Sequence, residues 1–142
     1  MPYTSQQILI DRYGEHTLVQ ATDRGDVATG TVDTDVVDRV LIDTDAVIDA
    51  HISGRYRLPV ATVPPLLVTI ASEIAIYKLH VYEPDPKLKA DYEAAMKSLT
   101  AISLGNIRLP IDGVEAPQTG NSGAEFTDRE RPFTETNLKG FI

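Results

Sequence analysis

The fold is decided by residues 33–82, which read DTDVVDRVLIDTDAVIDAHISGRYRLPVATVPPLLVTIASEIAIYKLHVY. In the first half of this stretch, apolar residues recur with the i, i+3, i+4, i+7 spacing of an amphipathic helix. They are Val36, Val37, Val40, Leu41, Val47, Ile48 and Ile52. Gly54 follows the last of them and Pro59 disfavours an immediate restart, so we expect this helix to end near Ser53.

The second half of the stretch predicts a different kind of helix. Pro64 and Pro65 stand at its first positions, where a fixed φ and a missing N–H cost little. Residues 66–82 are then apolar nearly all round, with a narrow polar strip made of Thr69, Ser72, Glu73 and His80. A helix that is apolar on every side is normally buried, so we expect residues 66–82 to form the centre of the fold.

Shorter patterns flank this pair of helices. Thr4 and Gln7 have the spacing of a capping box, which predicts a short first helix ending at Gly14. Residues 15–21 are compatible with a further turn or two of helix, and residues 22–32 are rich in Gly, Thr and Asp, which is typical of a loop.

A further helix is expected after the central pair. Asp85 and Pro86 are suited to its N-cap and first position, and Gly105 to its end. The apolar face of this helix consists of Leu88, Tyr92, Ala95, Met96, Leu99 and Ile102. The predicted fold class is therefore mainly α, a small bundle of about four helices over residues 1–105 with short connections.

Residues 106–142 are predicted to be an extended linker and a C-terminal docking tail. Residues 107–111 alternate apolar residues with Arg and Pro, and residues 112–125 are too polar and too rich in Gly and Pro to form a core. Apolar and aromatic residues then return beside arginines, a pattern typical of a segment that binds a partner. The residues predicted to bind it are Arg129, Arg131, Phe133, Leu138 and Phe141.

The composition limits the classes of function. The net charge of −8 disfavours nonspecific binding to nucleic acid or to an anionic membrane, and no window is apolar enough to predict a membrane span. The absence of cysteine excludes disulfides and thiolate chemistry. Four acidic residues form a stripe opposite the apolar face of the helix in the first half of the central stretch: Asp35, Asp38, Asp45 and Asp49. Such a stripe is either a solvated face or a functional repulsive surface.

The sequence contains no pattern that predicts catalysis, a cofactor or a metal site, so we expect a protein that is not an enzyme. His16, His51 and His80 lie in three separate segments without a second ligand nearby, which favours structural roles. Glu73, on the apolar helix, is expected to be paired, either with hydroxyl groups of its own helix or with an arginine of the preceding turn, because an unpaired buried charge is costly. The candidate partners are Thr69, Ser72, Tyr77, Arg55 and Arg57.

Several of these residues resemble the sequence signature of a known family. Its signature is found in the turn between the two helices of the central stretch, at Gly54, Arg55, Tyr56, Leu58, Pro59, Val60, Val63, Pro64, Pro65, Leu66 and Leu67, and in an N-terminal motif over residues 3–15. Over residues 3–105 the chain resembles the small virion proteins of Mu-like prophages, which are similar to the helical adaptors of the neck of tailed phages.

The resemblance implies a structural role. It implies a ring beneath the portal that joins the capsid to the tail, with the portal protein and tail or stopper proteins as partners, in the virion and, during assembly, in the host cytoplasm. The acidic stripe would then line a channel through which DNA slides without adhering. The alternative is a regulatory helix-turn-helix protein with residues 66–82 as recognition helix, but this helix offers DNA only Lys78 and His80. We therefore expect no sequence-specific binding to nucleic acid.

Overall fold

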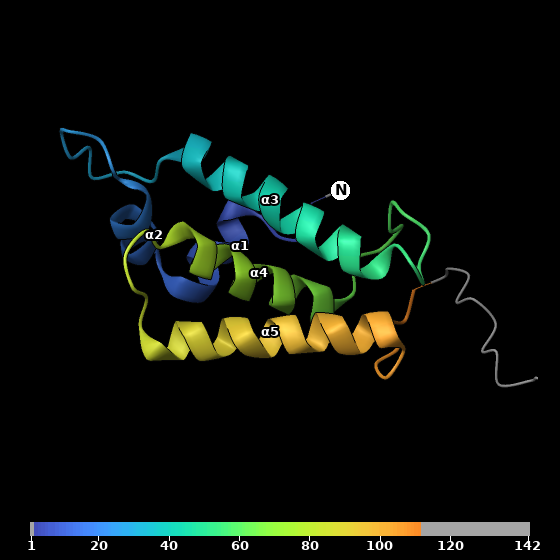
Figure 1. Ribbon diagram of the computed structural model, residues 1–142. Helices are drawn as coiled ribbons and strands as arrows, with labels where there is room; N and C mark the ends of the chain where they lie inside the picture. The colour runs from blue at the N-terminus through green and yellow to red at the C-terminus, as the bar shows by residue number, and fades with distance from the viewer. Residues whose placement is uncertain (1, 112–142) are drawn as a thin grey trace, which may run out of the picture.

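The structure is a computed structural model, and it describes residues 2–111. Within this range it contains five helices and no strand (Figure 1). They are α1 (Gln6–Tyr13), α2 (Glu15–Thr22), α3 (Thr34–Ile52), α4 (Pro65–Leu79) and α5 (Pro86–Leu104). The predicted mainly α class is confirmed, and residues 15–21 belong to a helix of their own.

The helix α4 is the centre of the fold. It contacts each of the other four helices, and it lies antiparallel to α3 and α5 (Figure 1). Its buried residues cover most of the helix circumference, and one strip, which includes Thr69, Glu73 and Tyr77, is partly exposed. The buried residues are Leu67, Ile70, Ala71, Ser72, Ile74, Ala75, Ile76 and Leu79. This burial confirms the predicted central helix and disfavours the helix-turn-helix alternative, because a recognition helix must expose a face to DNA.

The core consists of two apolar clusters, one toward each end of α4. One cluster joins α3, α4 and α5 around Ile48, Ile74 and Leu99. The other joins α1, α2 and α3 to the last turns of α4 around Leu9 and Leu79. The rings of Tyr77 on α4 and Tyr92 on α5 also stack between these helices, with centroids 4.1 Å apart.

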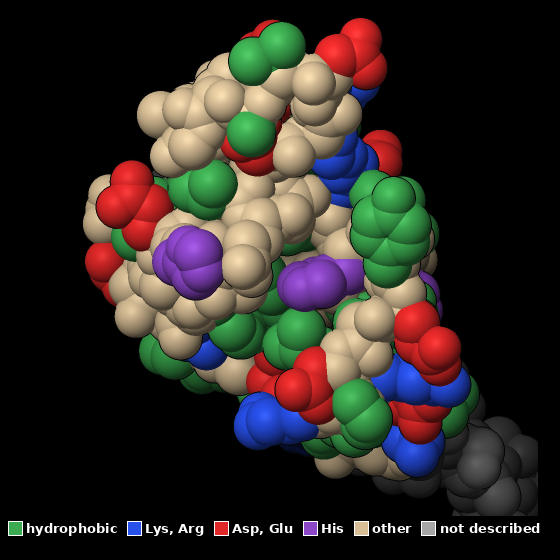
Figure 2. Space-filling model, turned by 90° about the vertical axis from the view of Figure 1, so that its left-hand side faces the viewer, with side chains coloured by type: hydrophobic (Ala, Val, Ile, Leu, Met, Phe, Trp, Pro, Cys, Tyr) green, Lys and Arg blue, Asp and Glu red, His purple; other side chains and the backbone are tan. Residues whose placement is uncertain are grey.

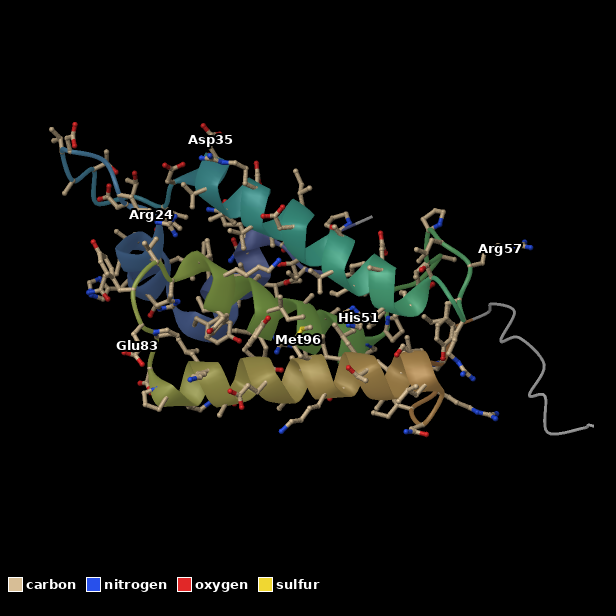
Figure 3. The ribbon with its side chains drawn as sticks, viewed as in Figure 1. Arg24, Asp35, His51, Arg57, Glu83 and Met96 are labelled. Atoms are coloured by element: carbon tan, nitrogen blue, oxygen red, sulfur yellow. The ribbon has the colours of Figure 1, made fainter. Side chains whose placement is uncertain are left out.

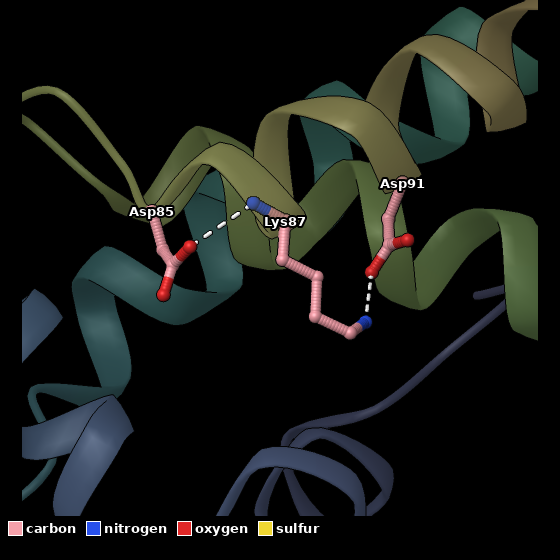
Figure 4. A network of polar contacts seen from close by, with 3 residues as sticks. All are labelled: Asp85, Lys87 and Asp91. Carbon is pink, nitrogen blue, oxygen red and sulfur yellow. Dashed lines mark hydrogen bonds and ion pairs between the residues drawn. The ribbon is translucent and has the colours of Figure 1, made fainter.

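Most predicted helix ends are confirmed. Asp33 caps α3, and Asp85 caps α5 by accepting from the N–H of Lys87. Lys87 also forms an i, i+4 ion pair with Asp91, with 2.6 Å between Nζ and Oδ2 (Figure 4). Gly105 ends α5 with a positive φ of 82°, which is a left-handed conformation that favours glycine.

Two predicted helix ends are wrong. The N-cap of α1 is Ser5, not Thr4, because the Thr4 hydroxyl is buried 3.1 Å from that of Ser72 and is used to join α1 to α4. The helix α4 ends at Leu79 and not at residue 82. Continued helix would bring the ring of Pro84 against the carbonyl of His80, four residues earlier.

The segment after Gly105 contributes to the core. Leu109 is buried, and its backbone N–H donates to the Tyr56 hydroxyl at 2.9 Å. Ile107 and Ile111 pack against the same cluster. The packed body therefore extends past Gly105, at least to Ile111.

Candidate interaction surfaces

The acidic stripe of α3 is divided into two parts with different surroundings. Asp35 and Asp38 are exposed, whereas Asp45 and Asp49 are half-buried beneath the N-terminal segment. Asp45 accepts from the backbone N–H of Tyr3 at 3.0 Å, and Asp49 accepts from the Tyr3 hydroxyl. Two members of the stripe therefore hold the N-terminal segment on α3, a use that the sequence pattern did not reveal.

This junction perturbs the protonation of its members. Burial, together with the neighbouring Asp49 carboxylate, raises the pKa of Tyr3 far above its ordinary value. Burial also raises the pKa of Asp45, and the hydrogen bond from Tyr3 opposes that rise. Both shifts show that the N-terminal segment shields this part of α3 from water.

A groove of about 530 Å³ lies between the N-terminal segment and α3. It is lined by Pro2, Thr4, Ser5, Gln6, Asp38, Leu41, Ile42 and Asp45. Ile42 is exposed here although it is a large apolar side chain. The groove thus combines carboxylates of the stripe with apolar surface.

One end of the bundle is formed by the loop between α2 and α3 and by the loop between α4 and α5 (Figure 1). We call it the acidic end. Its exposed carboxylates belong to Asp26, Asp33, Asp35, Glu83 and Asp85, and they are interspersed with some lysine and arginine side chains (Figure 2). The loops also expose Val27, Val81 and Tyr82, the last with 88 % of its surface accessible.

The acidic end contains a cleft of about 410 Å³. Its lining residues come from α2 and the two loops: Gln20, Ala21, Asp23, Arg24, Gly25, His80, Val81, Tyr82 and Glu83. Arg24, in the loop between α2 and α3, joins the ends of α2 and α4, because its guanidinium donates to the carbonyls of Ala21 and Leu79. Sequence reasoning missed this cleft, since residues 80–82 were expected to continue α4.

The opposite end, which we call the basic end, consists of the loop between α3 and α4 and the chain after α5. Arg55, Arg57 and Arg108 belong to it, and the sequence has no acidic residue between Asp49 and Glu73. Arg57 points away from the bundle (Figure 3). The Arg55 guanidinium lies over Gly105, where a Cβ would come within 2.4 Å of it.

The other titratable residues singled out from the sequence include Glu73, His51 and His80, and each lies beside groups of the protein's own helices. The charged groups acting on Glu73 are Asp91, Arg12 and Lys87, so the suggested pairing with Arg55 or Arg57 is wrong. Burial is the main reason that the pKa of Glu73 is raised. His51 and His80 each lie 2.7 Å from a carbonyl of the preceding turn. Among residues 2–111, no group of three or more His, Cys, Asp or Glu is placed to hold a metal ion.

Two further findings concern the predicted surfaces. Arg129, Arg131, Phe133, Leu138 and Phe141, the residues predicted to bind a partner, lie outside the described residues. In the described part of the chain, no helix has the length and apolar character that crossing a bilayer requires.

Over the described residues, the fold and its surfaces define a small helical protein. The chain belongs to the bacteriophage Mu Gp36 family, which matches residues 3–127. It is 28% identical over 140 residues to the Mu-like prophage FluMu protein gp36 of Haemophilus influenzae, covering 99% of this chain and 98% of that protein. It is 25% identical over 142 residues to Gene product J of Escherichia phage Mu, covering 100% of both. The resemblance to Mu-like prophage proteins is confirmed, and the protein is phage-related.

Proposed function

We propose that this protein is a structural, non-catalytic component of the virion, an adaptor that assembles as a ring under the portal and joins the capsid to the tail. Its partners would be the portal protein and tail or stopper proteins. It would reside in the virion, and in the host cytoplasm during assembly. The observation that carries the proposal is family membership over residues 3–127 of a chain whose described body is a helical bundle.

The body has features suited to such a role. Its core is continuous through α4, and the N-terminal segment is attached to α3 and α4 by the polar contacts of Tyr3 and Thr4. These attachments favour a rigid unit that presents fixed surfaces to neighbours, which an adaptor requires. Residues 112–142 would add a second contact, because their apolar and arginine residues resemble a peptide that binds a folded partner.

The acidic face of α3 is proposed to border the DNA channel. With Asp45 and Asp49 covered by Tyr3, this role falls mainly to Asp35 and Asp38, whose carboxylates are exposed. Negative charge there would repel the phosphate backbone and let DNA slide. Changing both residues to lysine should leave the fold intact and reduce infectivity, because cations in the channel would retain DNA. Unchanged infectivity of this variant would refute the channel role.

The adaptor role is tested by disrupting the gene in the phage that encodes it. We expect DNA-filled heads and separate tails to accumulate, visible by electron microscopy, because the junction between them is missing. Adding the purified full chain to the extract should restore joined particles. Normal virions without this protein would refute the proposed function, and empty heads with normal tails would place it at an earlier step.

A further inference from the structure

The two ends of the bundle carry opposite charge. At the basic end the contributing segments, residues 50–72 and 98–111, contain Arg55, Arg57 and Arg108 but no Asp or Glu. At the acidic end, carboxylates predominate, and Arg24 donates to the carbonyls of Ala21 in α2 and Leu79 in α4. The molecule is thus polarised along the axis of α4 and α5 (Figure 1).

Each end has an exposed charged side chain that the rest of the described body leaves unpartnered. Within residues 2–111 neither Arg57 nor Glu83 has a hydrogen bond or an ion pair. Their side chains lie at opposite ends of the bundle, Arg57 beside the loop after α3 and Glu83 beside the loop before α5 (Figure 3). A guanidinium and a carboxylate in these positions are complementary between two copies and too far apart to pair within one.

Exposed apolar side chains accompany the charges at both ends. Tyr82 and Val81 adjoin Glu83 on the acidic end, and Val81 has 63 % of its surface accessible. Leu104, in the last turn of α5, is 67 % accessible near the basic end. The ring of Tyr82 also borders the cleft of about 410 Å³, where an entering guanidinium would meet both a carboxylate and an aromatic face.

From this arrangement we infer that a second copy of this chain binds end to end, with Arg57 of one copy entering the cleft beside Glu83 and Tyr82 of the next. Such a contact uses two different surfaces, so it is heterologous and propagates to a closed ring or a filament. This contact would be the one between neighbouring subunits of the proposed ring, so the inference rests on the proposed function. The partner is a second copy of the chain, because the acidic end of one copy and the basic end of another carry complementary charges.

Charge reversal and its compensation test the contact in the full chain, by sedimentation velocity at low salt. Arg57→Glu and Glu83→Arg alone should each weaken self-association by about tenfold or more, and the double variant should restore most of the loss. Lys97→Glu and Glu93→Arg, matched in charge and on the exposed face of α5, should leave association unchanged. Raising the salt concentration should weaken the wild-type association.

The orientation is tested with engineered thiols, because the natural chain has no cysteine. A mixture of Ala61→Cys and Val81→Cys, one at each end, should form the mixed disulfide faster than either variant forms a disulfide with itself. Equal rates for like and unlike pairs would overturn the inference. The inference would also be overturned if the single reversals weakened self-association no more than their controls, or if the double variant stayed dissociated. A wild-type chain that is monomeric up to about 1 mM would overturn it as well.

These outcomes are separable from those for the proposed function. Suppose that the single charge reversals have no effect on self-association, while disruption of the gene still leaves heads and tails unjoined. The end-to-end contact would then be refuted and the adaptor role retained. Suppose instead that the double variant restores self-association, while disruption of the gene leaves virions normal. The adaptor role would then be refuted and the end-to-end contact retained.

Discussion

Tyr3 joins the N-terminal segment to the body through both its backbone and its side chain. It is 4 % exposed, its N–H donates to Asp45, and its hydroxyl donates to Asp49. A phenol in this position contributes apolar burial and a hydrogen bond to a carboxylate. The residue belongs to the N-terminal motif on which the family resemblance rests, and its contacts give a physical reason for that motif.

Tyr3→Phe should keep the packing and remove the hydrogen bond to Asp49. We expect the free energy of unfolding at pH 7 to fall by about 1–2 kcal/mol, measured by urea denaturation. The pKa of Tyr3 is raised above 10.0, so the folded state retains the phenol proton at a pH where the unfolded chain loses it. The contribution of Tyr3 is therefore present below pH 10 and is lost as the pH rises. An equal difference between wild type and variant at pH 7 and above pH 10 would contradict this assignment.

Gly105 is required by its conformation and by its neighbour. Its φ is 82°, and an added Cβ would lie 2.4 Å from the Arg55 guanidinium. Gly105→Ala should lower the free energy of unfolding by about 1–2 kcal/mol, whereas Gly54→Ala, with no atom within 4 Å of its Cβ position, should change it by less than about 0.5 kcal/mol. Similar losses at both positions would contradict the requirement for a glycine in the left-handed conformation at position 105.

Burial disfavours the ionised form of Glu73. Burial and the nearby Asp91 raise its pKa, which Arg12 and Lys87 partly oppose. Glu73→Gln should therefore raise the free energy of unfolding at pH 7 slightly, by up to about 0.5 kcal/mol at this partly exposed position. The gain should vanish as the pH falls below the ordinary pKa of glutamate, because Glu73 is then protonated in both the folded and the unfolded chain. A marked loss of stability at pH 7 would mean that Glu73 is held by a stronger partner than these contacts indicate.

At the scale of elements, α4 and α5 could be predicted from the sequence because local rules and burial agree there. Pro65 and Pro86 mark helix starts and Gly105 marks the end of α5, whereas the apolar pattern, which continues to residue 82, does not reveal the end of α4 at Leu79. The N-cap of α1 could not be predicted, because Thr4 and Ser5 are equally good caps and a tertiary contact with Ser72 decides between them. The cleft and the Tyr3 contacts likewise depend on segments distant in sequence, which periodicity does not bring together.

The segment after α5 allows a sharp truncation experiment. A chain ending at Ile111 should keep nearly the full stability of the body, because it retains Leu109 and its bond to Tyr56. A chain ending at Gly105 should lose about 2–4 kcal/mol, since it leaves a cavity and an unpaired buried hydroxyl. Thermal unfolding of both chains measures the difference. Equal melting temperatures would show that residues 106–111 do not belong to the body.

The same shorter chain also tests the predicted docking tail. We expect the chain ending at Ile111 to fold but to restore few joined particles in the extract, because Arg129, Arg131, Phe133, Leu138 and Phe141 are removed. Full activity of this chain would show that the tail is not needed for partner binding.

At the scale of the whole molecule, the described part of this member of the Mu Gp36 family is a helical bundle with oppositely charged ends. The fold class and the family followed from the sequence, because both depend on local patterns and motifs. The surfaces required the structure, since the opposite charges of the two ends become visible only when the loops of α2–α3 and α4–α5 are brought together.

The most direct measurement is electron cryo-microscopy of the virion that contains this protein. We expect a ring of density between portal and tail into which the described bundle fits as repeated copies, and this ring should be absent from particles made without the gene. Particles whose neck holds no density for this bundle, or a neck unchanged when the gene is disrupted, would contradict the adaptor role.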